Sequence, residues 1–326
     1  MTAFAAASPR AAVRTGFDGL AISVATRAMM KNLDQNFDAI LITGPTASGK
    51  SALALRLARE RNGVVINADS MQVYDTLRVL TARPSDHEME GVPHRLYGHV
   101  PAGSAYSTGE WLRDISGLLS DLRGEGRFPV IVGGTGLYFK ALTGGLSDMP
   151  AIPDDLREGL RARLIEEGAA KLHAELVSRD PSMAQMLQPG DGQRIVRALE
   201  VLEATGKSIR DFQRASGPMI IDPERAQKFI VLPERPVLHD RINRRFEAMM
   251  DSGAVEEVQA LLALNLAPDA TAMKAIGVAQ IADMLTGRMG AAEVIEKSAA
   301  ATRQYAKRQM TWFRNQMGDD WTRIQP

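Results

Sequence analysis

An eight-residue segment of this chain has the residue types and spacing of a phosphate-binding loop. It fits the pattern G-x-x-x-x-G-K-[ST] and consists of Gly44, Pro45, Thr46, Ala47, Ser48, Gly49, Lys50 and Ser51. The glycines let backbone N–H groups turn toward one centre and form an anion-binding nest, while Lys50 adds a positive charge. The Ser51 hydroxyl is the expected ligand of Mg²⁺. We therefore predict a site for a di- or triphosphate with Mg²⁺, and the pattern alone leaves the reaction open.

Two further polar residues are expected at the same edge of a sheet. Asp69 ends the apolar run 63–69, and Thr135 follows the run 128–132 and two glycines. The carboxyl ends of neighbouring strands in a doubly wound sheet face one crevice, so both residues should face the phosphate loop. Asp69 can alternatively cap a helix or a turn. A lone Asp beside a neutral Thr suits deprotonation of an acceptor better than activation of water.

An α/β framework is needed to bring these residues together. Short apolar runs at 38–43, 63–69, 128–132 and 228–232 predict buried strands. Helical spacing at 51–61 and 111–123 separates them, which predicts a parallel sheet of the P-loop NTPase type with helices on both faces.

Helical patterns alone fill two other parts of the chain. The first spans about 152–215, with segments at 154–167, 169–179, 194–205 and 209–214, and the second spans 237–317. We therefore predict a core formed by 37–145 and 226–326, with a helical C-terminal region, interrupted by a helical insertion at 146–225.

Composition excludes several classes of function. The chain has 326 residues and no cysteine, which excludes a disulfide framework, a Cys-zinc site, an Fe–S cluster and a thiol nucleophile. No apolar run reaches the ~18 residues that span a bilayer, so we expect a cytoplasmic protein without a membrane segment. Lys+Arg and Asp+Glu both number 39, so nucleic-acid binding would depend on local clustering of charge.

Residues 1–36 differ from the rest of the chain in being rich in Ala, and they carry the basic Arg10 and Arg14 with no acidic residue before Asp18. This composition is shared by transit peptides and by disordered tails. It is also compatible with translation starting later, at Met29 or Met30. We predict a disordered N-terminal extension and, with no motif for assembly, a monomer.

Seven motifs in the chain together resemble the tRNA dimethylallyltransferases, also called tRNA isopentenyltransferases or the IPP transferase family. They are GPTASGKS at 44–51, NADSMQVY at 67–74, TARPS at 81–85, PHRLYG at 93–98, GGTGLYFKAL at 133–142, QRIVRALEV at 193–201 and TRQYAKRQMTWFR at 302–314. The phosphate loop alone is shared by many families, whereas the combination is specific. The resemblance extends from about residue 40 to 321.

The resemblance implies transfer of a dimethylallyl group from dimethylallyl diphosphate to N6 of adenosine 37 in tRNAs reading codons that begin with U. The phosphate loop would then hold the diphosphate leaving group with Mg²⁺, and Asp69 would be the general base. Thr135 would be a contact near the reacting centre, and Lys50 would stabilise developing charge. Arg241 or Arg245, one helical turn apart, would assist on the diphosphate side, unless both lie on a solvated helix face.

The same resemblance implies a set of tRNA-facing positions. They are Asp69, Ser70, Met71, Gln72, Thr135, Arg157, Gln193, Arg194, Ile195, Val196, Arg197, Lys307, Arg308, Gln309 and Arg314. Local charge agrees, because residues 299–318 carry four basic residues and no acidic one. Trp312 and Phe313 interleave with these charges, and their alternative interpretation is the apolar face of the terminal helix.

Two alternative functions remain open from the residues. A prenyltransferase acting on free adenine nucleotides would share the phosphate loop, but a small acceptor needs neither a helical insertion nor a basic terminal helix. A small-molecule kinase would use the loop and Asp69, but would leave GGTGLY and the 302–314 cluster unexplained.

Overall fold

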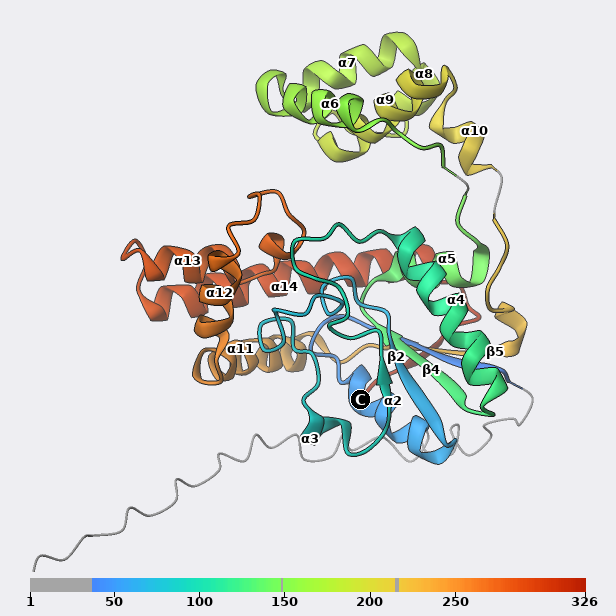
Figure 1. Ribbon diagram of the computed structural model, residues 1–326, viewed down its shortest axis with the longest axis vertical. Helices are drawn as coiled ribbons and strands as arrows, with labels where there is room; N and C mark the ends of the chain where they lie inside the picture. Colours follow the sequence, from blue (N-terminus) through green and yellow to red (C-terminus); the bar gives the residue numbers. More distant parts are fainter. Residues whose placement is uncertain (1–36, 148, 215–216) are drawn as a thin grey trace, which may run out of the picture. The chain divides into compact units, whose positions relative to one another are not determined.

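In the computed structural model, which describes residues 37–147, 149–214 and 217–326, six short strands form one sheet in the order β3-β2-β4-β1-β5-β6 (Figure 1). They are β1 (Ala39–Thr43), β2 (Gly63–Asn67), β3 (His94–Arg95), β4 (Phe128–Gly133), β5 (Ala226–Val231) and β6 (Thr322–Ile324). The pairs β1–β4, β2–β4, β2–β3 and β5–β6 are parallel. The predicted parallel α/β class is confirmed. The predicted N-terminal extension, 1–36, lies outside the described residues.

The four strands expected from apolar runs are present, and most of their residues are buried. Every residue of β1 and β2 is buried, which explains why these segments are continuously apolar rather than alternating. Helix α2 (Lys50–Glu60) packs Leu53 and Leu57 against them. This packing fixes the turn between β1 and α2, where the phosphate loop lies.

The chain divides into two compact units. The first unit contains most of the sheet and consists, among the described residues, of 37–103, Arg127–Gly134 and Lys228–Pro326. Its other helices are α3 (Asp86–Met89), α11 (Arg235–Asp251), α12 (Ala254–Ala263), the short 3-10 helix η2 (Ala272–Lys274), α13 (Val278–Leu285) and α14 (Ala291–Gln316).

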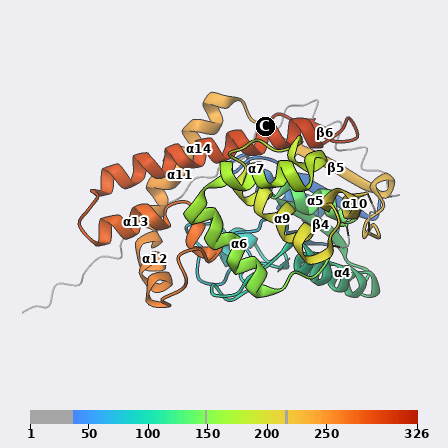
Figure 2. The same cartoon turned by 90° about the horizontal axis from the view of Figure 1, so that it is seen from above.

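Within the first unit, α11 and α14 lie side by side (Figure 2). Leu238 and Ile242 of α11 meet Ala299 and Ala306 of α14, and Ala47 of the phosphate loop packs against this cluster. The long C-terminal helix is therefore held beside the phosphate loop.

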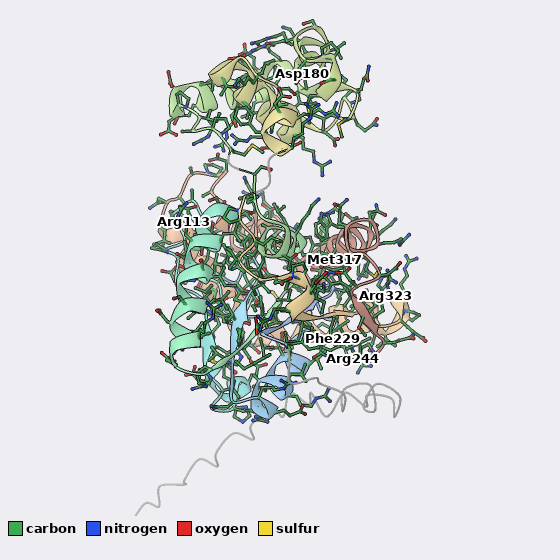
Figure 3. The ribbon with its side chains drawn as sticks, turned by 90° about the vertical axis from the view of Figure 1, so that its right-hand side faces the viewer. Arg113, Asp180, Phe229, Arg244, Met317 and Arg323 are labelled. Carbon is green, nitrogen blue, oxygen red and sulfur yellow. The ribbon has the colours of Figure 1, made fainter. Side chains whose placement is uncertain are left out.

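At the sheet edge, Phe229 of β5 and Arg323 of β6 lie on adjoining strands (Figure 3).

The second unit is helical and consists of Ser104–Gly126 and Thr135–Gln227. Its elements are α4 (Thr108–Gly124), α5 (Gly136–Gly144), α6 (Asp154–Glu167), α7 (Ala169–Arg179), α8 (Pro181–Ala184), α9 (Gly192–Thr205), α10 (Ile209–Gln213) and the 3-10 helix η1 (Pro223–Arg225). Leu160, Leu172, Leu176 and Leu199 are buried together in a core of this unit's own. Asp180, labelled in Figure 3, caps α8 by accepting the Met183 N–H.

The predicted insertion and the second unit do not have the same extent. The compact unit also takes in α4 and α5, whose Trp111 and Tyr138 rings stack with centroids 4.3 Å apart. The boundaries 146–225 of the predicted tRNA-binding insertion stay a prediction.

No helix in the described ranges combines the length and the apolar character needed to cross a membrane.

Candidate active site

The phosphate loop connects β1 to α2 and is held by its own backbone. The Ser48 N–H donates to the Pro45 carbonyl over 3.2 Å, and the Lys50 Nζ donates to the same oxygen over 3.2 Å. Ala47 and Gly49 have positive φ angles of 62° and 91°, which turn the chain back on itself before the first turn of α2. At Gly44 a side chain cannot be accommodated, since its Cβ would lie 2.5 Å from the Val231 carbonyl oxygen. The loop therefore lies against the carboxyl end of β5.

Lys50 has an unusual electrostatic environment. Burial of the ammonium group lowers the pKa of Lys50 to about 8, the Asp69 charge opposes this shift, and the Arg245 charge adds to it. Lys50 is therefore within electrostatic range of both residues. An anion bound in the loop would favour the charged form of this lysine.

Asp69 is positioned by the residue that ends β2. The fully buried Asn67 donates its Nδ2 to the Asp69 and Leu96 carbonyls, both over 3.0 Å, and its Oδ1 accepts the Asp69 N–H over 2.9 Å. The Asp69 Oδ1 in turn accepts the Met71 N–H over 3.0 Å. The carboxylate is therefore fixed in direction at the end of its strand.

Gln309 of α14 joins the phosphate loop to the end of β4. Its Oε1 accepts the Thr46 N–H and its Nε2 donates to the Gly134 carbonyl, each over 2.9 Å. A Cβ added at Gly134 would lie 2.4 Å from Gln309 Nε2 and 3.2 Å from Asp69 Oδ2. Thr46, Asp69, Gly134 and Gln309 are thus brought together, and Gln309, which we predicted to face tRNA, is buried among them.

Two arginines of α11 also belong to this site. Arg241 donates its Nη1 to the Ser48 carbonyl over 3.3 Å, so it lies against the phosphate loop. Burial lowers the pKa of Arg245, an effect that the charges of Glu88 and Asp69 oppose. Arg241 therefore contacts the loop backbone, and Arg245 lies in the electrostatic range of Asp69.

Two tyrosines in this region were not predicted as site residues. Burial raises the pKa of both Tyr97 and Tyr305, and the nearby Asp69 charge raises each further. Both stand inside motifs that carried the family resemblance, PHRLYG and TRQYAKRQ, which was the only signal available in the sequence.

The other predicted tRNA-facing residues have varied surroundings. In the first unit, Gln72 donates its Nε2 to the Thr81 and Ala82 carbonyls over 2.9 Å each, while Ser70 and Met71 are half-buried. Lys307, Arg308 and Arg314 are exposed on α14.

In the second unit, Thr135 directly precedes α5, and Arg157 pairs with Asp154 over 2.9 Å. On α9, Gln193 and Arg194 are exposed. The other three predicted residues of α9 are Ile195 and Val196, which are buried in the helical core, and Arg197, which pairs with Glu200.

Comparison with known proteins identifies the family. A family model described as IPP transferase matches residues 72–316, and one described as Isopentenyl transferase matches residues 37–99. The chain belongs to the IPP transferase family. The family predicted from the motifs is thereby confirmed, and the chain is an enzyme of the prenyltransferase class. The two alternatives, a free-nucleotide prenyltransferase and a kinase, are not favoured.

Relatives of this IPP transferase cover nearly its whole length. A tRNA dimethylallyltransferase of Allorhizobium ampelinum is 72% identical over 298 residues, which are 91% of this chain and 98% of the relative. The solved structure of a tRNA isopentenylpyrophosphate transferase from Bacillus halodurans is 34% identical, with a TM-score of 0.62, covering 88% of this chain and 89% of its own. The solved structure of a eukaryotic dimethylallyltransferase acting on tRNA has a TM-score of 0.72 and is 28% identical. The match covers 84% of this chain and 69% of the eukaryotic chain.

Proposed function

We propose that this enzyme transfers the dimethylallyl group of dimethylallyl diphosphate to N6 of adenosine 37 in tRNAs reading codons that begin with U, releasing diphosphate. The names of the relatives support the reaction and the acceptor. The observation that carries the proposal is that Gln309 joins the Thr46 N–H of the phosphate loop to the Gly134 carbonyl, and that a Cβ at Gly134 would lie 3.2 Å from Asp69 Oδ2. A base and an anion site are thus close together, as transfer from a diphosphate to a weak amine nucleophile requires.

The donor is proposed to bind through its diphosphate. The loop from Gly44 to Ser51 offers backbone N–H groups and the positive end of α2, and Lys50 and Arg241 add charge. These groups would stabilise the negative charge that develops as the bond between the prenyl carbon and the diphosphate oxygen breaks. The bonding electron pair leaves with the diphosphate.

Mg²⁺ fits this site as an ion that arrives with the diphosphate. Among the described residues no group of three or more His, Cys, Asp or Glu side chains could hold a metal. Mg²⁺ commonly uses one or two protein oxygens together with waters and substrate phosphates, and Ser51 at the start of α2 would supply such an oxygen. When bound, the ion would neutralise charge on the diphosphate oxygens.

Asp69 is proposed as the general base at the acceptor. Its carboxylate would accept the proton of the adenine N6 amine as the new N–C bond forms at carbon 1 of the prenyl group. Because Asn67 fixes the Asp69 backbone and the Met71 N–H binds the carboxylate, the carboxylate is already oriented before the acceptor arrives. Thr135 would contact the reacting centre from the start of α5.

The tRNA is proposed to bind through Gln193, Arg194 and Arg157 of the helical unit and through the exposed basic residues of α14. Adenosine 37 would have to leave the anticodon-loop stack to bring N6 to Asp69. We expect the enzyme to act as a monomer in the cytoplasm.

A label-transfer assay tests the proposal. The protein is incubated with Mg²⁺ and radiolabelled dimethylallyl diphosphate, with unmodified A36-A37-A38 tRNA, the same tRNA carrying G37, or AMP. We expect label in the A37 tRNA alone. Label in AMP would instead indicate a nucleotide-modifying enzyme, and an absence of label with consumption of ATP would contradict prenyl transfer altogether.

A further inference from the structure

A carboxylate outside the site described so far holds the loop that begins at Asp69. Glu257, in the first turn of α12, accepts three consecutive backbone N–H groups. Its Oε1 accepts from Arg78 over 3.0 Å and from Val79 over 2.7 Å, and its Oε2 accepts from Val79 over 2.9 Å and from Leu80 over 3.1 Å. Hydrogen bonds to an ionised acceptor are about twice as strong as neutral ones. This side chain is therefore a strong attachment between α12 and residues 78–80.

Residues 78–80 are connected to Asp69 through two short stretches of chain and the hydrogen bonds between them. The next two carbonyls along the chain, those of Thr81 and Ala82, accept both protons of the Gln72 amide over 2.9 Å each. Gln72 lies three residues after Asp69, and the intervening Met71 N–H holds the Asp69 carboxylate over 3.0 Å. A shift of residues 78–80 would therefore displace Gln72 and, with it, the turn that orients the carboxylate.

The same loop is also supported by contacts that do not involve Glu257. Arg83 closes the loop internally by donating to the Tyr74 and Asp75 carbonyls over 3.0 and 3.2 Å. Leu80 is buried and lies close to Gly277, since a Cβ added at Gly277 would lie 2.8 Å from Leu80 Cδ1. The apolar packing of Leu80 limits how far the loop can move, whereas the hydrogen bonds from three N–H groups to Glu257 fix the orientation of its backbone.

We infer that Glu257 is a positioning residue for the transfer reaction, acting on Asp69 through residues 78–82 and Gln72. Within the described part of the chain its hydrogen bonds go to residues 78–80, so its effect should fall on the acceptor half of the reaction. The inference rests on the base role proposed above for Asp69. Replacing Glu257 by Gln would present an amide NH₂ to backbone donors and break part of the attachment, with little change in side-chain volume.

A double-mutant cycle measured by single-turnover transfer tests this inference. Radiolabelled dimethylallyl diphosphate and unmodified tRNA are used with Glu257→Gln, Asp69→Asn and the double variant. Glu256→Gln is the matched control, since it removes an exposed carboxylate from the same helical turn. We expect Glu257→Gln to slow transfer about 10- to 100-fold, because small displacements of a reacting group have effects of this size, while tRNA affinity stays within about twofold.

The double variant separates positioning from a general structural role. If Glu257 acts through Asp69, adding Glu257→Gln to Asp69→Asn should slow transfer by less than about twofold further. An equal loss in both backgrounds, or a Glu257→Gln variant as fast as Glu256→Gln, would overturn the inference. Should Glu257→Gln not fold, Glu257→Asp, which retains the charge on a shorter side chain, is expected to transfer about tenfold more slowly, and a control-like rate would again overturn it.

The outcomes also distinguish this inference from the proposed function. Asp69→Asn transferring at the wild-type rate would overturn the base role itself. A normal loss in Asp69→Asn together with an unaffected Glu257→Gln would overturn the positioning role alone.

Discussion

Replacing Gly134 by Ala is a specific perturbation of the candidate active site. The added Cβ would lie 2.4 Å from Gln309 Nε2, which is far inside normal contact, and 3.2 Å from Asp69 Oδ2. Gly134 has no positive φ, so the backbone itself tolerates alanine. The substitution therefore acts through space alone, by pushing the Gln309 amide away from its two partners.

The magnitude follows from those two hydrogen bonds. Moving the amide by about 1 Å would break its bond to the Gly134 carbonyl and loosen its bond to the Thr46 N–H, both now 2.9 Å. Each lost hydrogen bond costs about 1 kcal/mol, and more when a buried partner stays unpaired, so the free energy of unfolding should fall by about 1–3 kcal/mol. Because Thr46 lies in the phosphate loop and Asp69 is crowded by the same methyl group, kcat/KM should fall about 10- to 100-fold.

Thermal unfolding and single-turnover label transfer measure the two effects. Gly117→Ala is the control, since Gly117 lies within α4 and a Cβ there would meet nothing within 4 Å. Gly134→Ala should have a much smaller effect in the Gln309→Ala variant than in the wild type, because the clashing amide is absent. The reasoning is refuted if Gly134→Ala resembles Gly117→Ala in both assays, or if its effect is undiminished when Gln309 is removed.

Three further predictions concern pH, tRNA contacts and the helical unit. Burial lowers the pKa of Lys50 to about 8, so its positive charge is lost as pH rises through that value. The KM for dimethylallyl diphosphate should therefore rise up to about tenfold per pH unit above 8. The Lys50→Met variant should not show this pH dependence. Arg308→Ala should weaken tRNA binding and reduce the slope of log K against log salt by about 1, whereas an unchanged slope would exclude a phosphate contact. Leu176 is fully buried in the helical core, so Leu176→Ala should lower the free energy of unfolding by about 2–5 kcal/mol. The same variant should bind tRNA more weakly but bind diphosphate normally. Val177→Ala is the control, since Val177 is 46% exposed on the same helix.

The main strands and the phosphate loop could be predicted because their signals are local. Strands buried on both faces leave continuous apolar runs, and the loop is defined by eight consecutive residues. The edge strands β3 and β6 could not be predicted, since two and three residues are too few to carry a periodic pattern. Their pairing with β2 and β5 is a contact between distant segments, which the local sequence does not show.

The parts of the site that were missed depend on contacts between distant segments. Glu257 binds backbone 177–179 residues away, and no spacing rule connects a carboxylate on one helix to a loop so far along the chain. Gln309 shows a related difficulty. Its neighbour Arg308 is exposed while Gln309 is buried, because adjacent helical residues point about 100° apart, and a motif does not reveal which residue faces inward. Phe313 is also buried, in agreement with its interpretation as part of the apolar face of the helix.

Single-turnover transfer by Asp69→Asn, with tRNA affinity measured on the same preparation, tests the central claim most directly. If the Asp69 carboxylate accepts the N6 proton, the variant should bind tRNA within about twofold of wild type and transfer the prenyl group at least about 100-fold more slowly. Transfer at the wild-type rate, or a loss fully explained by weaker tRNA binding, would contradict the assignment of Asp69 as the base.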